Sequence, residues 1–531
     1  KGAWITTAID GYKYTVEKDD KGKEFNKPLG ERNPKWLNDD YVKFIRFAQL
    51  KMDAVEEGVV GIITNHSWLD NPTFRGMRQS LMRSFDQIYV LDLHGNAKKK
   101  EVAPDGSKDE NIFDIEQGVA ISVFVKKPGL ERGVWRGDMW GKRIEKYRAG
   151  SELALKNLAH KGIEVTEPTY LFLDQSADDR DEYSDGLSIN QIFPINSVGI
   201  VTARDHLTIQ FTDADVVQVI SDFSRSEPND ARIKYSLGPD VEDWRVAWAQ
   251  ADLVESSLDP SNIEQIAYRP FDLRSTYYTG KARGFICRPR NSVMKHFRRG
   301  TIGIDVCRFV VGSWRHVMAI CDLVDDSFVS NKTKERGYAF PLYTESGENL
   351  SPAFRSFVDA RYHGHHYSAE QILGYIYAIL HAPSYRRRYA EFLRIDFPRI
   401  PFAEKREDFE ELSKLGADLI EAHLLRKFPR RGLADYHGRG DNSVEKPRYV
   451  EAEARVLINE TQSFAPVPKN VWEFHIGGYQ VFDKYLKSRK GRKLSLDEIN
   501  HIAAVAEVLA FTIEQMARID KAWAKAYPDR G

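Results

Sequence analysis

Three short apolar runs that alternate with helical patterns constrain the fold of this chain more than any other feature. The runs cover residues 59–64, 88–93 and 119–125, and they are rich in the β-branched and aliphatic side chains of buried strands. Helical spacing of apolar residues marks segments 41–50 and 75–85. Strands that alternate with helices predict an α/β sheet, whose ligands bind in the loops at the strand ends.

The composition bounds the number of packed units and disfavours several classes of protein. With 531 residues, of which 42% are hydrophobic, the chain is long enough for two to three packed units. Its 77 basic and 78 acidic residues nearly balance, so any nucleic-acid surface must be local. The three cysteines lack the spacing of a zinc or redox motif, and no apolar run approaches the roughly 20 residues that span a bilayer. We therefore expect a reduced, cytoplasmic protein without a membrane segment.

The pattern changes after residue 130. Residues 131–160 are highly charged and predict a connecting helix, and residues 168–343 contain short β-like runs broken by Pro, Gly and Asp, which indicate a β-rich unit. Helical patterns return at 368–380, 384–393, 409–425 and 496–519. We predict an α/β unit at 1–150, a helical connector at 151–180, a mixed α/β unit at 181–440 and its helical C-terminal part at 441–531.

The loop after the first strand contains candidate pocket residues. Asn65 and Trp68 offer an amide and an indole at a strand end, groups that suit a pocket for a nucleic-acid base. The alternative, which the residues alone slightly favour, is that Asn65 caps the next helix and Trp68 fills the core. His66 by itself does not make a metal site, and we assign no metal ligand.

Two arginine-rich segments are candidates for contact with nucleic acid. Residues 281–300 contain seven Lys or Arg and no acidic residue, and they are interleaved with Phe285 and Phe297. A second basic segment lies at 385–388. The alternative is a solvated surface neutralised by salt bridges, and the residues alone favour neither reading. The candidate contact residues are Arg283, Arg288, Arg290, Arg298, Arg386 and Arg387.

Several catalytic motifs do not occur in this sequence. It has neither a glycine-rich loop for a methyl donor nor an Asn/Asp-Pro-Pro-aromatic loop for a flipped base, and the run Asn71-Pro72-Thr73-Phe74 only mimics the latter. It also has no phosphate-binding loop, no metalloprotease helix and no nucleophile elbow. We therefore assign no catalytic residue, and an enzyme acting on a small molecule is disfavoured.

Motifs along the whole chain resemble one family. The first half contains GIITN (61–65), RGMR (75–78), FDQIYVLDLHGN (85–96), DENIFDI (109–115) and GVAIS (118–122). The second half contains SVGIVTARD (197–205), YRPFD (268–272), YIYAILH (375–381), YRRRY (385–389), FPRIP (397–401), VWEF (471–474) and IGGYQV (476–481). In this order they resemble γ-class adenine-N6 DNA methyltransferases of the single-polypeptide type I (type ISP) restriction-modification family.

The resemblance implies a fold and a function. The expected fold is α/β: the C-terminal portion of a Rossmann-like methyltransferase sheet, followed by a mixed α/β target-recognition domain with a helical C-terminus. The expected function is recognition of double-stranded DNA for adenine-N6 methylation by S-adenosylmethionine. In this family the catalytic Asn-Pro-Pro-Tyr loop precedes the segment matching residues 1–4, so the donor site is expected to lie mostly outside this chain. The missing N-terminal methyltransferase, ATPase and nuclease modules are expected partners, and the chain alone is expected to be inactive.

A second interpretation stays open. The chain could be a non-catalytic DNA-specificity subunit that a partner chain completes. That interpretation predicts an exposed apolar sheet edge where the first strands of the sheet would pair.

Overall fold

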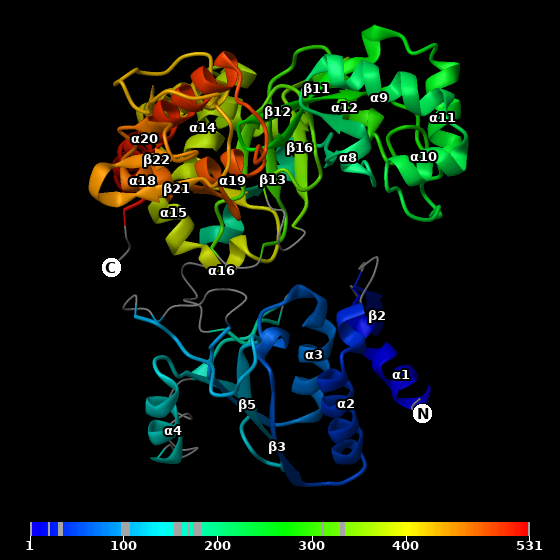
Figure 1. Cartoon of the computed structure of the whole chain (residues 1–531). Helices are drawn as coiled ribbons and strands as arrows, with labels where there is room; N and C mark the ends of the chain where they lie inside the picture. The colour runs from blue at the N-terminus through cyan, green and yellow to red at the C-terminus, as the bar shows by residue number, and fades with distance from the viewer. Residues whose placement is uncertain are drawn as a thin grey trace. The chain divides into compact units, whose positions relative to one another are not determined.

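The computed structural model describes residues 3–19, 22–29, 35–96, 103, 107–152, 162–167, 170–173, 182–310, 313–329 and 335–528. The chain divides into two compact units, Lys1–Asp181 (unit 1) and Glu182–Gly531 (unit 2). Figure 1 shows unit 1 in blue to cyan and most of unit 2 in green to red. None of the described helices is long and apolar enough to cross a membrane.

A five-stranded sheet with the order β3-β5-β4-β6-β7 forms the centre of unit 1. β5 is antiparallel to both β3 and β4, so β3 and β4 run in the same direction, and β6 is parallel to β4. The strands are β3 (Gly58–Asn65), β4 (Gln87–Asp92), β5 (Val119–Lys126), β6 (Gly133–Asp138) and β7 (Gly162–Ile163). The strands predicted at 59–64, 88–93 and 119–125 are confirmed as β3, β4 and β5.

Helices α2 (Asp40–Asp53) and α3 (Arg75–Ser84) pack against one face of this sheet (Figure 1). Ile45 of α2 and Leu81 of α3 share a buried core with Phe124 of β5. Both helices were predicted from the spacing of their apolar residues. Burial of these residues against the sheet explains why the helices form here. Unit 1 also contains α1 (Ala3–Ile9) and the hairpin β1 (Tyr14–Lys18) and β2 (Glu24–Pro28).

The prediction of one charged helix over 131–160 was wrong for its first part. Residues 133–138 form β6, and helix α4 covers Arg143–Glu152. The prediction failed because a charged residue such as Arg136 suggests an exposed position. In the fold, Arg136 of β6 is buried and paired with Asp92 of β4. Such pairing lets a charged residue occupy a sheet interior, and no local pattern reveals it. Most of the predicted connector at 151–180 lies outside the described residues.

The described part of unit 2 contains three four-stranded sheets: β10-β12-β11-β15 and β14-β13-β16-β9 in its first part, and β20-β23-β22-β21 in its C-terminal part. Pairing in the first two of these sheets is antiparallel except between β11 and β15, and pairing in the third is antiparallel throughout. The strands of the first two sheets are β9 (Ser197–Val198), β10 (Ile209–Gln210), β11 (Ile263–Arg269), β12 (Asp272–Tyr277), β13 (Gly303–Cys307), β14 (Val317–Ile320), β15 (Leu323–Val324) and β16 (Gly337–Pro341). The mixed α/β architecture with several sheets and a helical C-terminus is confirmed.

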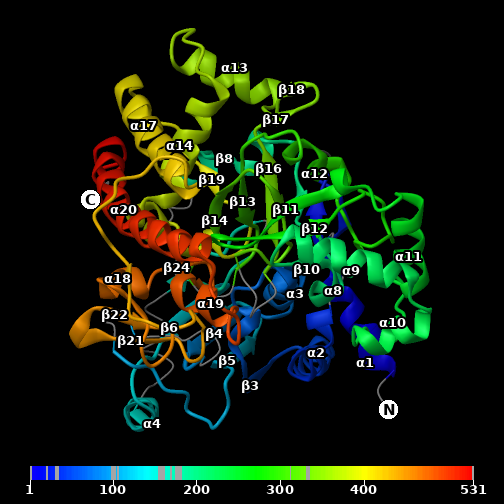
Figure 2. The ribbon, with the colours of Figure 1, turned by 45° about the horizontal axis from the view of Figure 1, so that its top comes forward.

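The interpretation of 168–343 as β-rich missed several helices. Helices α9 (Asp213–Arg225), α10 (Pro228–Lys234) and α11 (Val246–Glu255) connect β10 to β11, and α12 (Asn291–Phe297) follows β12. The acidic residues that suggested turns lie in the first turn of α9, where they favour a helix N-terminus. α10, α11 and α9 lie together at one edge of unit 2 (Figure 2).

The C-terminal part of unit 2 is helical. Helices α14 (Ala369–His381), α17 (Arg406–His423) and α20 (Leu496–Ala526) pack together, and α15 (Pro383–Arg388) lies against α20 (Figures 1 and 2). These helices confirm the four helical patterns predicted there. The shorter helices are α7 (Ile189–Ile192), α8 (Asp205–Thr208), α13 (Pro352–Arg361), α16 (Ala390–Leu393), α18 (Lys469–Trp472) and α19 (Val481–Lys487). The remaining strands are β8 (Leu187–Ser188), β17 (Tyr343–Thr344), β18 (Gly347–Glu348), β19 (Arg399–Ile400), β20 (Asp435–His437), β21 (Arg448–Val450), β22 (Arg455–Leu457), β23 (Ser463–Ala465), β24 (His475–Ile476) and β25 (Tyr479–Gln480).

Candidate functional site

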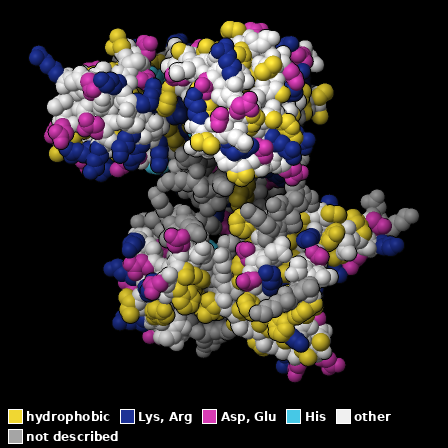
Figure 3. All heavy atoms as spheres, turned by 45° about the vertical axis from the view of Figure 1, so that its right-hand side comes forward, with side chains coloured by type: hydrophobic (Ala, Val, Ile, Leu, Met, Phe, Trp, Pro, Cys, Tyr) yellow, Lys and Arg dark blue, Asp and Glu magenta, His cyan; other side chains and the backbone are white. Residues whose placement is uncertain are grey.

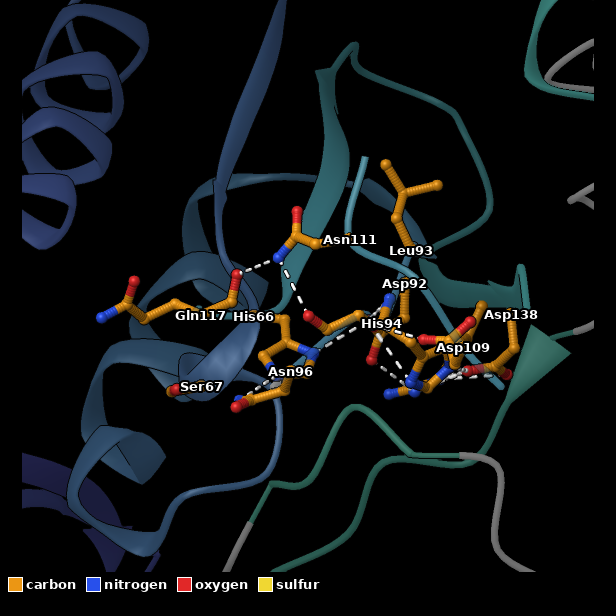
Figure 4. A network of polar contacts seen from close by, with 12 residues as sticks. His66, Ser67, Asp92, Leu93, His94, Asn96, Asp109, Asn111, Gln117 and Asp138 are labelled. Atoms are coloured by element: carbon orange, nitrogen blue, oxygen red, sulfur yellow. Dashed lines mark hydrogen bonds and ion pairs between the residues drawn. The ribbon is translucent and has the colours of Figure 1, made fainter. Parts of the chain in front are cut away.

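A buried polar network lies where β3, β4 and β6 end in unit 1 (Figure 4). Nδ1 of His66 lies 2.9 Å from Oδ1 of Asp92, and Nε2 of His94 lies 2.9 Å from Oδ1 of Asp138. Arg136 connects the two halves, since its Nη2 donates to Asp92 Oδ2 at 2.8 Å and to Asp138 Oδ1 at 2.7 Å. The network therefore fastens three strand ends together through side chains.

The network keeps its carboxylates charged. Burial alone would raise the pKa of Asp92, but the hydrogen bond from His66 and the nearby charges of His66 and Arg136 hold that pKa well below its usual range. Burial also opposes ionisation of Asp138, and hydrogen bonds from His94 and Arg136 lower its pKa nonetheless. Both aspartates are therefore anions at neutral pH, and they neutralise the buried guanidinium.

Ligand atoms of His66, Asp92 and His94 lie within 4.8 Å of one another, a spacing that a metal ion can use. A cation there would have to break the hydrogen bond between His66 and Asp92. It would also stand close to the Arg136 guanidinium, which already binds the same carboxylate. The geometry thus fits a structural ion-pair network better than a metal centre, and we assign no metal to it.

The two pocket candidates of the sequence occupy different environments. Asn65 is half-buried at the end of β3, and its Oδ1 accepts a hydrogen bond from the backbone N–H of Ser67. Trp68 is 0% exposed, its Nε1 donates to Thr64, and its ring packs against Phe172. Asn65 therefore caps a short turn, and Trp68 packs in the core of unit 1.

Most basic residues of the segment 281–300 are ion-paired in unit 2. Arg288 pairs with Asp243, and Arg298 pairs with Glu264 at 2.6 Å. The remaining pairs are Lys281 with Glu255, and Lys295 and Arg299 with Glu345. Figure 3 shows Lys and Arg interspersed with Asp and Glu over unit 2, together with one denser group of basic side chains. The sequence segment lacks acidic residues, but the folded surface supplies them.

Arg283 and Arg290 lie in the same segment in different settings. Arg283 is exposed, has φ 60°, and holds its guanidinium carbon 5.7 Å from the centroid of the Trp248 ring. Arg290 is half-buried, has φ 57°, and precedes helix α12. The guanidinium of Arg283 is therefore presented to solvent beside an aromatic ring.

The second basic segment forms helix α15. Arg386 is half-buried, its Nε donates to the carbonyl of Leu380 at 2.6 Å, and its guanidinium lies over Trp314. Burial and the nearby charge of Arg315 lower the pKa of Arg386 to about 9. Arg387 is exposed and donates to Ser384 at 2.9 Å. Of the two, Arg387 is the one that is open to solvent.

Two features of the surface of unit 2 were not predicted from the sequence. Arg245 and Trp248 join Arg283 in one cluster, although an Arg-x-x-Trp spacing at the start of a helix was available as a signal. A further basic run lies in 484–493, next to the start of α20. Its exposed members include Lys487, Lys490 and Lys493.

Comparisons with known proteins identify the second half of the chain. Residues 191–518 match the family model described as the Type ISP C-terminal specificity domain. None of the curated protein sequences compared with this chain matches it.

Three solved structures share its fold. They are a DrdV–DNA complex (21% identity, TM-score 0.65), a nuclease-deletion mutant of the Type ISP restriction-modification enzyme LlaGI with a DNA substrate mimic (18%, 0.66), and the ATP-dependent Type ISP restriction-modification enzyme LlaBIII bound to DNA (19%, 0.66). The matches cover 91%, 97% and 97% of this chain. They cover only 52%, 42% and 35% of the respective solved chains, so this chain spans about half of their length or less.

Proposed function

The chain belongs to the family of Type ISP C-terminal specificity domains, and from this premise we propose that unit 2 recognises a specific sequence in duplex DNA for a restriction-modification system. The observation that carries the proposal is the family match over 191–518, which spans the three four-stranded sheets of unit 2 and most of its helical C-terminal part. The DNA complexes of similar fold support it.

The proposed contacts with DNA come from arginines that do not already pair with a carboxylate. Arg283 and Arg387 are exposed and have no ion pair among the described residues. Arg288 and Arg298 would first have to leave Asp243 and Glu264, which reduces the free energy they could gain from a phosphate. Arg290 stays a candidate as the first residue before α12, whereas the guanidinium of Arg386 is engaged inside unit 2.

For unit 1 we propose a role as the later strands of a Rossmann-like methyltransferase sheet. In the complete enzyme the reaction would be methylation of adenine N6 by S-adenosylmethionine on a base turned out of the duplex. We assign no residue of this chain to the donor or to catalysis. Asn65, half-buried at a strand end, is kept as a candidate for the wall of the base pocket.

One observation supports completion of this sheet by further strands, on the same polypeptide or on a partner chain. No described strand pairs with the outer edge of β3, and its side chains Val59 and Ile63 are 64% and 50% exposed. An open, apolar edge strand invites pairing with another strand. This is the feature that the specificity-subunit interpretation predicts, and further methyltransferase strands on the same polypeptide would pair with this edge equally well.

Selection from a randomised duplex pool tests the proposed function. The purified chain is incubated with the pool at moderate salt in the presence of non-specific competitor, and the retained duplexes are sequenced. We expect enrichment of one asymmetric motif that contains adenine. Binding without any enriched motif, or no binding, would contradict sequence recognition by this chain.

A further inference from the structure

Two arginines and a tryptophan form a cluster on the surface of unit 2. The guanidinium carbon of Arg245 lies 4.6 Å from the centroid of the Trp248 ring, and that of Arg283 lies 5.7 Å from it. Arg245 and Arg283 are exposed, and Trp248 is partly exposed. Trp248 belongs to α11, at the outer edge of unit 2 (Figures 1 and 2). One indole thus holds two cationic planar groups at the surface.

Neither guanidinium is neutralised by an ion pair within the part of the chain that the structure describes. Burial opposes ionisation of Asp240, yet its pKa is lowered by the hydrogen bond from Val246 and by Arg232, and Arg245 adds only a small further effect. Asp240 itself accepts hydrogen bonds from Arg232 at 3.0 Å and from the backbone N–H of Val246 at 3.1 Å. The pair therefore differs from Arg288 and Arg298, whose donors are occupied by carboxylates.

Hydrogen bonds from Trp244, just before α11, and to Asp252, within α11, hold the loop that contains Arg283. Trp244 donates through Nε1 to the carbonyl of Phe285 at 3.3 Å. Two turns further along, buried Asp252 accepts hydrogen bonds from the backbone N–H of Phe285 at 2.8 Å and from Thr279 Oγ1 at 3.0 Å. Trp248 lies between these two anchors in the sequence, so Arg283 is held against its ring.

Close packing at Gly284 and the backbone conformation of Arg283 both restrict this loop. A Cβ on Gly284 would overlap the carboxylate of Asp252, so a larger residue there would displace the side chain that anchors the loop. Arg283 adopts φ 60°, a conformation that side-chain-bearing residues rarely occupy, and its N–H donates to Cys287 O at 3.0 Å. Such backbone strain persists where the surroundings fix it, and ordering the loop in advance lowers the cost of binding.

We propose that the Arg245–Trp248–Arg283 cluster reads guanine bases in the major groove of the target duplex. The inference deepens and rests on the proposed function. A guanidinium fork matches the O6 and N7 acceptors of guanine, and this match needs a fixed orientation as well as a charge. Contact with the Trp248 ring restricts the orientation of each guanidinium, and no carboxylate among the described residues pairs with their N–H donors. A phosphate contact would need only the charge.

The test compares the motif selected by the wild-type chain with those selected by four variants. Arg245→Ala and Arg283→Ala each remove one guanidinium, Arg283→Lys keeps the charge without the fork, and Trp248→Phe keeps an aromatic ring. Arg406→Ala is the matched control, because Arg406 is exposed on α17 and already pairs with Glu410. Circular dichroism of each variant confirms that unit 2 remains folded.

We expect both arginine-to-alanine variants to lose discrimination at one or two G·C positions of the motif by about 10- to 100-fold, while the other positions keep their preference. Arg283→Lys should lose nearly as much discrimination as Arg283→Ala. Trp248→Phe should weaken discrimination at the same positions by a smaller factor, and Arg406→Ala should select the wild-type motif.

Two outcomes would overturn the inference while leaving the proposed function intact. The first is an unchanged motif and affinity in Arg245→Ala and Arg283→Ala, which would place the cluster outside the interface. The second is a uniform loss of affinity with a shallower salt dependence and full rescue by Arg283→Lys, which would show phosphate contact. If the wild-type chain selects no motif, the proposed function fails and the inference fails with it.

Discussion

At the scale of single residues, the carboxyl of Asp305 in unit 2 is a buried acid without hydrogen-bond partners. Asp305 lies in the middle of β13, is 0% exposed, and neither of its oxygens has a hydrogen-bond partner. Burial, together with the nearby carboxylates of Asp325 and Asp326, raises its pKa to about 8. Asp305 is therefore protonated in the folded protein at neutral pH, whereas an unfolded chain ionises it near pH 4.

Replacement of Asp305 by Asn should change how stability depends on pH. Between about pH 4 and pH 8 the folded state binds one proton more than the unfolded state at this residue. The free energy of unfolding therefore falls as pH rises, by at most about 1.4 kcal/mol per pH unit. Asp305→Asn should lose this part of the slope. The measurement is the free energy of unfolding in urea at pH 5 and at pH 8, with hydrogen exchange of the β13 amides as the local probe.

Asp441→Asn serves as the control for this measurement. Hydrogen bonds from Lys493 and Ser443 lower the pKa of Asp441 to about 2, so Asp441 is ionised in both states over this range. Its replacement should leave the slope unchanged. Equal slopes in wild type and Asp305→Asn would show that Asp305 is not the buried acid inferred here.

At the scale of elements, the helical C-terminal part depends on a close approach of α14 and α17. Gly374 of α14 faces Gly416 of α17, and a Cβ on Gly416 would overlap the carbonyl oxygen of Gly374. Ser413, one turn before Gly416, donates to the carbonyl of Gln371 at 2.7 Å. Small residues at the crossing thus let the two backbones approach each other.

Gly416→Ala should destabilise the helical part of unit 2. A methyl group inserted between two backbones forces the helices apart, at a cost of roughly 1–3 kcal/mol. Gly150→Ala is the matched control, because Gly150 lies inside α4 with no atom within 4 Å of an added Cβ. That change should stabilise α4 slightly, by roughly 0.5–1 kcal/mol. Thermal unfolding measures both, and a wild-type melting temperature for Gly416→Ala would contradict the close packing.

At the scale of the whole molecule, the sheet of unit 1 has an open edge. β3 pairs only with β5 among the described strands, and on the face that Figure 3 draws hydrophobic side chains gather in patches over unit 1. Val59 and Ile63 of β3 are more than 40% exposed, as are Phe44 and Phe47 of α2. An edge of this kind pairs with a further strand in a complete sheet, or with a second molecule when nothing covers it.

Lysines on β3 should therefore reduce self-association. The double variant Val59→Lys with Ile63→Lys places charges on the exposed face of the edge strand, while the residues that face α2 and α3 stay unchanged. We expect the wild-type chain to form larger species as its concentration rises and the variant to remain smaller, as measured by light scattering after size exclusion.

Ile233→Lys with Leu496→Lys is the matched control for the edge. Both residues are exposed in unit 2, at 78% and 71%, and neither belongs to a sheet. This variant should behave like wild type. A monomeric wild-type chain at every concentration, or an equal effect of the two double variants, would show that the β3 edge does not drive association.

The candidate surface of unit 2 was only partly predictable from the sequence. The segment 281–300 contains no acidic residue, which suggested an open basic patch. In the fold, Arg288 meets Asp243, Arg298 meets Glu264 and Lys295 meets Glu345. These partners lie 34 to 50 positions away along the chain, so no local pattern could anticipate them.

The sequence by itself determined the elements whose stability depends on local spacing. β3, β4, β5 and the long helices of unit 2 were predicted because burial of one face imposes a period of 2.0 or 3.6 on apolar residues. The order of motifs along the chain also predicted the family, to which the match over 191–518 assigns it.

Only the tertiary structure decided which polar groups are available for binding. Arg136 looked like part of a charged helix and is a buried strand residue, because Asp92 and Asp138 neutralise it. Arg283 resembled its basic neighbours in the sequence and differs from them in the fold, where its guanidinium lies beside the Trp248 ring and not against a carboxylate. The physical reason is that pairing and desolvation of a charge depend on groups that folding brings together from distant positions.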